Sequence, residues 1–76
     1  MNFDKIKEVI ADTVSIDEAE ITLDADLKED LGIDSLDAVE ISIALEEAFD
    51  ISIPQEELAK FVTVQDIVDF VDAQNA

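Results

Sequence analysis

Apolar residues recur at helical spacing in the first fifteen positions of the chain. Intervals of three and four residues place them on one face of a helix. The pattern predicts a helix over residues 3–15, with Asn2 as a candidate cap and Asp4 at its positive end. Its polar side is not the strongly basic face of a membrane-surface helix, so a structural role is favoured. The predicted core face consists of Phe3, Ile6, Val9, Ile10 and Val14.

A second helix is predicted over residues 35–50, and it carries two apolar stripes. The wider stripe has core spacing and consists of Ala38, Ile41, Leu45, Ala48 and Phe49. The narrower stripe lies roughly opposite and consists of Leu36, Val39 and Ile43. Glu40, Glu46, Glu47 and Asp50 border it. These carboxylates favour a solvent-facing docking surface, and burial of both stripes is the alternative.

The segment between these helices, residues 16–34, has no regular apolar period. Its apolar residues are scattered among Asp, Glu and Thr, and would pin the segment across the helices. A loop of this length is uncommon in a compact domain unless it is functional. We therefore expect a long ordered loop.

The C-terminal third predicts a turn and two further helices. Residues 51–54 alternate briefly, but four residues with a proline favour a turn over a strand. Pro54 suits the first position of a short helix that ends at Lys60. Thr63 and Asp66 then resemble a capping box for a helix that ends near Asp72. The apolar face of this last helix is Val64, Ile67, Val68 and Val71, with Phe70 at its margin.

These elements predict an all-α fold. We expect a small four-helix bundle, with three longer helices, one short helix and a long loop between the first and second. Residues 1–76 are interpreted as a single domain near the lower size limit for a self-sufficient core. The short helix must depend on its neighbours, and residues 74–76 are expected to fray.

A formal net charge of −17 restricts the partners of the chain. The four cations are Lys5, Lys7, Lys28 and Lys60. Nucleic acid and anionic membranes require many more, so partners with basic surfaces are expected instead. No apolar run approaches a membrane span or signal segment, and a soluble, cytoplasmic and monomeric protein is the default expectation.

Residue types missing from the chain argue against catalysis and against a dedicated metal site. Without His or Cys the commonest acid–base group and the commonest nucleophile are absent. Asp24 and Asp26 have the first ligand spacing of a calcium-binding EF-hand loop. However, Glu29 then stands where that loop needs glycine, and Ser35 where it needs glutamate. We expect no enzyme activity and at most nonspecific divalent-cation binding.

Ser35 is the candidate functional residue because two capping residues stand together at the start of the second helix. Gly32 ends the preceding structure, and Asp34 or Ser35 can cap the helix. If Asp34 caps, the hydroxyl of Ser35 is left exposed at a positive helix end, where a phosphate ester is favoured. The alternative is that Ser35 is only a cap.

Two motifs carry a family resemblance that covers essentially the whole chain. The first is DLGIDSLD at residues 30–37, and the second is ALEEAFD at residues 44–50. With the acidic composition and the length, they resemble acyl carrier proteins, most closely the free-standing bacterial type of fatty acid synthesis. Ile33 is bulkier than the residue often found there, and Ile43 stands where methionine is common.

The resemblance implies a covalent 4′-phosphopantetheine on Ser35, flanked by Asp34 and Leu36. It also implies that Leu27 and Leu31 pack inward. A phosphopantetheinyl transferase would attach the arm, and basic patches of fatty acid synthesis enzymes would dock on the second helix. The docking residues implied are Asp37, Val39, Glu40, Ile43, Glu46 and Glu47.

By the same resemblance the arm holds acyl chains as thioesters, and the chains insert between the helices. The residues expected along that path are Leu45, Ile53, Leu58, Phe61 and Ile67. Two alternatives stay open. One is a carrier for polyketide, nonribosomal peptide or D-alanyl transfer, and the other is an unmodified acidic interaction module.

Overall fold

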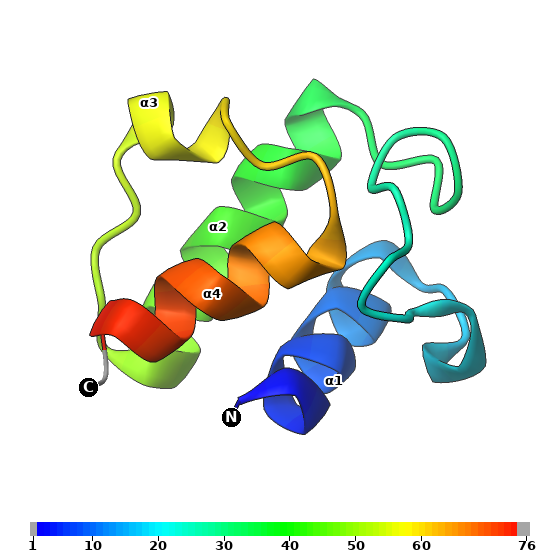
Figure 1. The fold of residues 1–76 in the computed structure, drawn as a ribbon, viewed down its shortest axis with the longest axis horizontal. Helices are drawn as coiled ribbons and strands as arrows, with labels where there is room; N and C mark the ends of the chain where they lie inside the picture. Colours follow the sequence, from blue (N-terminus) through cyan, green and yellow to red (C-terminus); the bar gives the residue numbers. More distant parts are fainter. Residues whose placement is uncertain (1, 75–76) are drawn as a thin grey trace.

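The described part of the chain, residues 2–74 of the computed structural model, contains four helices and one 3-10 turn connected by loops (Figure 1). The elements are α1 (Phe3–Val14), η1 (Glu18–Glu20), α2 (Ser35–Phe49), α3 (Gln55–Leu58) and α4 (Val64–Gln74). Helix α1 packs along α2, α3 contacts α2, and a long loop joins α1 to α2. The predicted all-α architecture is confirmed. None of the described helices has the length and apolar character needed to cross a membrane.

The core joins α1, α2 and α4 through aliphatic side chains. Its largest fully buried members are Ile6, Ile10, Leu45, Val64, Val68 and Val71. Each of the three longer helices supplies part of this set from the face that its apolar spacing predicts. Burial of these side chains stabilises the fold through the hydrophobic effect.

The buried face of α2 differs from the prediction at two positions. Ala48 is exposed, whereas Ser42 is buried with 7% of its surface accessible. The buried face therefore centres nearer to Leu45 and Phe49 than the predicted stripe does. The Ser42 hydroxyl donates to the carbonyl of Val39 at 2.7 Å, which satisfies the polar group within its own helix.

Asn2 occupies the N-cap position of α1, but its side chain does not cap the helix as predicted. Instead its Nδ2 and its backbone N–H donate to Oδ1 of Asp72, at 2.8 and 3.1 Å. Because Asp72 lies in the last turns of α4, this contact joins the start of α1 to the far end of the chain.

The loop between α1 and α2 is held by backbone hydrogen bonds to the segment before α4. The N–H of Leu27 donates to the carbonyl of Val62 at 2.9 Å, and the N–H of Val64 donates to Ala25 at 3.1 Å. Leu27 and Leu31 are partly buried against the core, as expected. A short 3-10 turn, η1, interrupts the predicted loop, and Asp17 caps it.

Helix α3 is shorter than predicted, and Pro54 precedes it instead of starting it. Pro54 is extended, with ψ of 148°, and its carbonyl accepts the N–H groups of Glu57 and Leu58. Beyond Ala59 the backbone hydrogen bonds span three residues instead of four. The N–H of Lys60 donates to the Glu57 carbonyl, and the N–H of Phe61 donates to the Leu58 carbonyl. The chain therefore leaves the α-helix before Lys60.

Helix α4 begins with the predicted capping box. Oδ2 of Asp66 accepts the N–H groups of Val62 and Thr63 at 2.8 and 3.1 Å, and Thr63 Oγ1 accepts the N–H of Asp66 at 3.4 Å. These backbone donors hold the pKa of the Asp66 carboxyl below its ordinary value. The helix continues through Gln74, which was expected to fray. Asn75 and Ala76 lie outside the described residues.

Replacing Asp66 by alanine is expected to lower the free energy of unfolding by about 1 kcal/mol at neutral pH, a typical loss for a helix cap. The folded-state pKa lies below the ordinary value of 3.8, so this contribution is fully present above that value. It is lost as the pH falls through the lowered pKa. Urea unfolding at about pH 7 and about pH 3 should therefore show a smaller cost in acid.

Asp69→Ala is the matched control, because it removes the same charge from an exposed position of the same helix. Its cost should vary less with pH than the cost of Asp66→Ala. An equal cost for Asp66→Ala at both pH values would contradict the capping role.

Candidate functional site

The start of α2 is capped by Asp34, which leaves Ser35 as the first helical residue. Oδ1 of Asp34 accepts the N–H of Asp37 at 2.9 Å, and Oδ2 of Asp37 accepts the N–H of Asp34 at 3.5 Å. This reciprocal pair is a capping box. Ser35 is exposed, and its hydroxyl stands beside the positive end of the helix. The sequence left the cap open between two residues, and the structure assigns it to Asp34.

The residues before the cap bring the chain to the surface at a defined point. Gly32 has a φ of +67°, a conformation that residues with a Cβ rarely adopt. Ile33 is then buried, with 5% of its surface accessible, and its N–H donates to the carbonyl of Leu27 at 2.9 Å. An anchored Ile33 fixes where Asp34 and Ser35 emerge.

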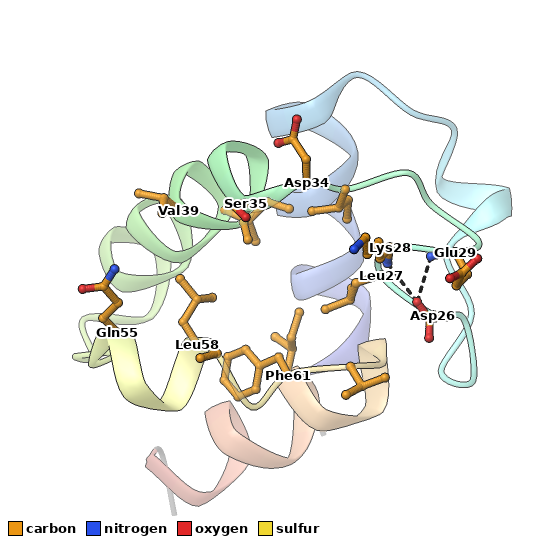
Figure 2. Close-up of a pocket in the computed structure, with 16 residues that line it drawn as sticks. Asp26, Leu27, Lys28, Glu29, Asp34, Ser35, Val39, Gln55, Leu58 and Phe61 are labelled. Carbon is orange, nitrogen blue, oxygen red and sulfur yellow. Dashed lines mark hydrogen bonds between the residues drawn. The ribbon is translucent and has the colours of Figure 1, made fainter.

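A groove of about 660 Å³ opens beside Ser35. Figure 2 shows Ser35 and Val39 of α2 on one side and Leu58 and Phe61 on the other. Ile41 and Ile67 contribute apolar surface to it. The Phe61 ring packs edge-on against Phe70, with centroids 5.6 Å apart, which supports that wall.

Only part of the predicted acyl path lines this groove. Leu58, Phe61 and Ile67 do, but Leu45 and Ile53 are buried in the core away from it. Sequence reasoning did not assign Gln55, Ala59 or Val62 to this wall. The apolar spacing of the helices gave no signal for them, because the groove forms between segments far apart in the chain.

The narrow stripe on α2 faces solvent, as predicted. Leu36, Val39 and Ile43 expose 68%, 39% and 51% of their surface. The alternative in which both stripes are buried is therefore wrong. Glu40 and Glu47 beside the stripe are exposed, and Asp37 is half-buried. Their docking role stays a prediction.

Glu46 has a structural contact that sequence analysis missed. It is half-buried, and its Oε2 accepts the N–H of Ile53 at 2.7 Å. Ile53 is buried and stands directly before Pro54 and α3. The carboxylate therefore ties α2 to the segment that leads into the far wall of the groove. This contact between a helix and the turn that follows it has no signature in the local spacing of either residue.

Comparison with known proteins places the chain in a family. A family model described as the phosphopantetheine attachment site matches residues 4–71. An acyl carrier protein of Clostridium perfringens strain SM101 is 49% identical over 69 residues, 91% of each chain. The chain belongs to the acyl carrier protein family.

Further relatives agree with this family. An acyl carrier protein of Clostridium acetobutylicum is 48% identical over 73 residues, covering 96% of this chain and 95% of the relative. A solved structure from Mycobacterium tuberculosis that bears the name of acyl carrier protein aligns with a TM-score of 0.89 and 30% identity. The alignment covers 96% of this chain and 97% of that one.

As an acyl carrier protein, the chain carries a covalently attached 4′-phosphopantetheine. The site suits this group, because an attachment residue needs an accessible hydroxyl and room for a long arm. Ser35 supplies an exposed hydroxyl, and the groove opens beside it. The N–H groups at the start of α2 favour the negative charge of a phosphodiester.

Replacing Glu46 by alanine is expected to lower the free energy of unfolding by about 1–3 kcal/mol, because the N–H of buried Ile53 loses a charged acceptor. It should also speed amide hydrogen exchange at Ile53. Glu47→Ala is the matched control, since it removes the same charge from the next, exposed position. We expect that control to change stability by less than about 0.5 kcal/mol. Equal stability of the two variants would show that the Ile53 contact contributes nothing.

Proposed function

We propose that Ser35 is the attachment residue and that this carrier protein delivers acyl groups, held as thioesters, to enzymes of fatty acid synthesis. The observation that carries the proposal is the exposed Ser35 hydroxyl at the first position of α2, freed by the Asp34 cap. It lies inside the region that the phosphopantetheine attachment model matches. The acidic α2 motif and the acyl carrier names of the relatives support the fatty acid pathway.

Ser35 acts as the nucleophile when the arm is attached. Its hydroxyl oxygen forms the new bond to the phosphorus next to the pantetheine, the phosphoanhydride bond of coenzyme A breaks so that the nucleotide portion leaves, and the serine proton passes to a base of the transferase. The chain has no His and no Cys with which to perform this step itself. When bound, the arm supplies the thiol that the polypeptide lacks. Catalysis on the cargo belongs to partner enzymes, and the carrier is not itself an enzyme.

The exposed stripe on α2 is the proposed docking surface for those partners. Leu36, Val39 and Ile43 offer apolar contacts, and Glu40 and Glu47 beside them offer negative charge. Partners with a basic rim would be steered to this face. Because exposed charges add more to the association rate than to affinity, the complexes should be short-lived and sensitive to salt.

The groove beside Ser35 is the proposed shelter for the cargo. An acyl chain left in water costs roughly 0.8 kcal/mol for each exposed methylene. Leu58, Phe61 and Ile67 supply an apolar surface that could cover it. The thermal stability of the loaded protein should then depend on acyl length, and the proposed shelter would be abandoned if it did not.

Ser35→Ala should abolish loading while the fold is kept. Because Asp34 is the cap, the substitution is expected to change stability by less than about 0.5 kcal/mol. Incubation with coenzyme A and a phosphopantetheinyl transferase, followed by mass spectrometry, measures loading, and circular dichroism measures folding. Ser52→Ala, at another exposed serine, should load fully.

The outcome of this loading assay separates the rival functions. A wild-type protein that gains no mass would be an unmodified acidic module, and loading at another residue would remove the role of Ser35. If the loaded protein accepted amino acids or D-alanine from their loading enzymes but not malonyl groups, the fatty acid pathway would be wrong. Acceptance of malonyl groups and elongation by fatty acid synthesis enzymes would support it.

Glu40→Lys and Glu47→Lys should each slow turnover by several partner enzymes, by roughly threefold or more at low salt, because they oppose a basic docking rim. The effect should shrink at high salt as the charges are screened. Glu8→Lys is the control, since it makes the same charge change at an exposed position of α1. Undiminished turnover at low salt for both α2 variants would refute the docking surface.

A further inference from the structure

Lys28 is the cationic residue among those that line the groove. The charged side chains beside it there are Asp26, Glu29 and Asp34, and Ser35 lines the same groove. In the view of Figure 2, Lys28 lies between the Asp26 and Glu29 pair and the start of α2. Lys28 is therefore a positive charge among three carboxylates at the groove.

The carboxylates of the described chain do not neutralise Lys28 directly. Within residues 2–74, the ion pairs closer than 4.0 Å join Lys7 to Asp4 and Lys60 to Glu57, and neither includes Lys28. The chain has 21 acidic residues, yet none of the described ones reaches this ammonium group at that distance. The exposed side chain therefore keeps its charge available to a ligand at the groove.

Hydrogen bonds fix the backbone of Lys28 within the loop that leads to Ser35. Its N–H donates to Oδ1 of Asp26 at 2.9 Å, and its carbonyl accepts the N–H of Gly32 at 3.2 Å. The N–H of Ile33 donates to the neighbouring Leu27 carbonyl at 2.9 Å. The loop from Asp26 to Ile33 is therefore one hydrogen-bonded unit that ends two residues before Ser35, and Lys28 lines the groove from it.

A phosphodiester on Ser35 would bring a further negative charge to this acidic rim. Asp34 is the adjacent residue, and Asp26 and Glu29 line the same groove, so the new charge would be repelled on that side. Lys28 is the group of opposite sign there. Pairing with it would relieve the repulsion and hold the root of the arm toward the groove.

We propose that Lys28 is a positioning residue that pairs with the phosphodiester carried on Ser35 and directs the arm over the groove, away from the outer face of α2. This inference rests on the proposed attachment at Ser35. It gives Lys28, the cation among the described residues that line the groove, a specific partner. It also places the arm where the apolar side chains of Leu58 and Phe61 can receive its cargo.

Chemical footprinting of the lysines tests the pairing without any activity assay. The unmodified and the loaded protein are treated with a limiting acetylating reagent at low salt, and acetylation at each lysine is measured by mass spectrometry. Loading should slow acetylation of Lys28 by roughly two- to fivefold, the range expected for an exposed ion pair. Lys5 is the internal control, because it is exposed on α1, and its rate should not change. High salt should remove the difference.

Phosphorus NMR of loaded variants provides the second measurement. The ³¹P shift of wild-type protein and of Lys5→Gln should change with salt as the pair dissociates, whereas that of Lys28→Gln should not. Two outcomes with a completely loaded protein would overturn this inference alone. One is a Lys28 acetylation rate that loading does not change, and the other is a ³¹P shift that responds to salt in Lys28→Gln as it does in the wild type. Failure of Ser35 to load would overturn the proposed function and this inference together.

Discussion

The hydrogen bonds between Asp34 and Asp37 decide what Ser35 can do. Both residues at the start of α2 can cap a helix, and a serine that capped would have its oxygen engaged by the backbone. Because Asp34 is the cap and accepts the Asp37 N–H at 2.9 Å, Ser35 lies one residue after the cap and is exposed to solvent. The same helix end that needs the cap supplies the positive potential that suits a phosphate ester. The start of α2 and the exposure of the Ser35 hydroxyl therefore both depend on the Asp34 carboxylate.

Several other carboxylates also accept backbone N–H groups, which gives a chain of net charge −17 a way to fold. Repulsion among so many negative charges opposes the compact state, and a chain of 76 residues can bury only a small core. Carboxylates that accept backbone donors at helix ends and loops offset part of that cost, since bonds to a charged group are stronger than neutral ones. Besides Asp34, those within residues 2–74 are Asp17, Asp26, Asp30, Asp37, Glu46, Asp66 and Asp72.

Local patterns predicted what local forces decide. The helices followed from apolar spacing, and the box of Thr63 and Asp66 from the identity of two residues. Some errors were local, at the two ends of α3, and others arose where separate segments meet. Asn2 binds Asp72, 70 positions away, instead of capping its own helix, and Glu46 binds the N–H of Ile53. The groove likewise forms between α2 and the segment of α3 and the turn after it. Sequence patterns therefore indicated Ser35 as the candidate residue but could not predict which side chains surround it.

Helix α2 contacts the core, solvent and the groove with different residues. Its core face and its exposed face account for the two apolar stripes in its sequence. Leu45 points to the core, Ile43 to solvent, and Val39 both exposes 39% of its surface and lines the groove. Under the proposed function, a partner that covers Val39 therefore also covers one edge of the groove. Docking and cargo transfer would then occur on one side of the molecule, beside Ser35. Glu46 ties this helix to the segment before α3, so the wall formed by α2 is linked through one hydrogen bond to the chain that leads into the opposite wall.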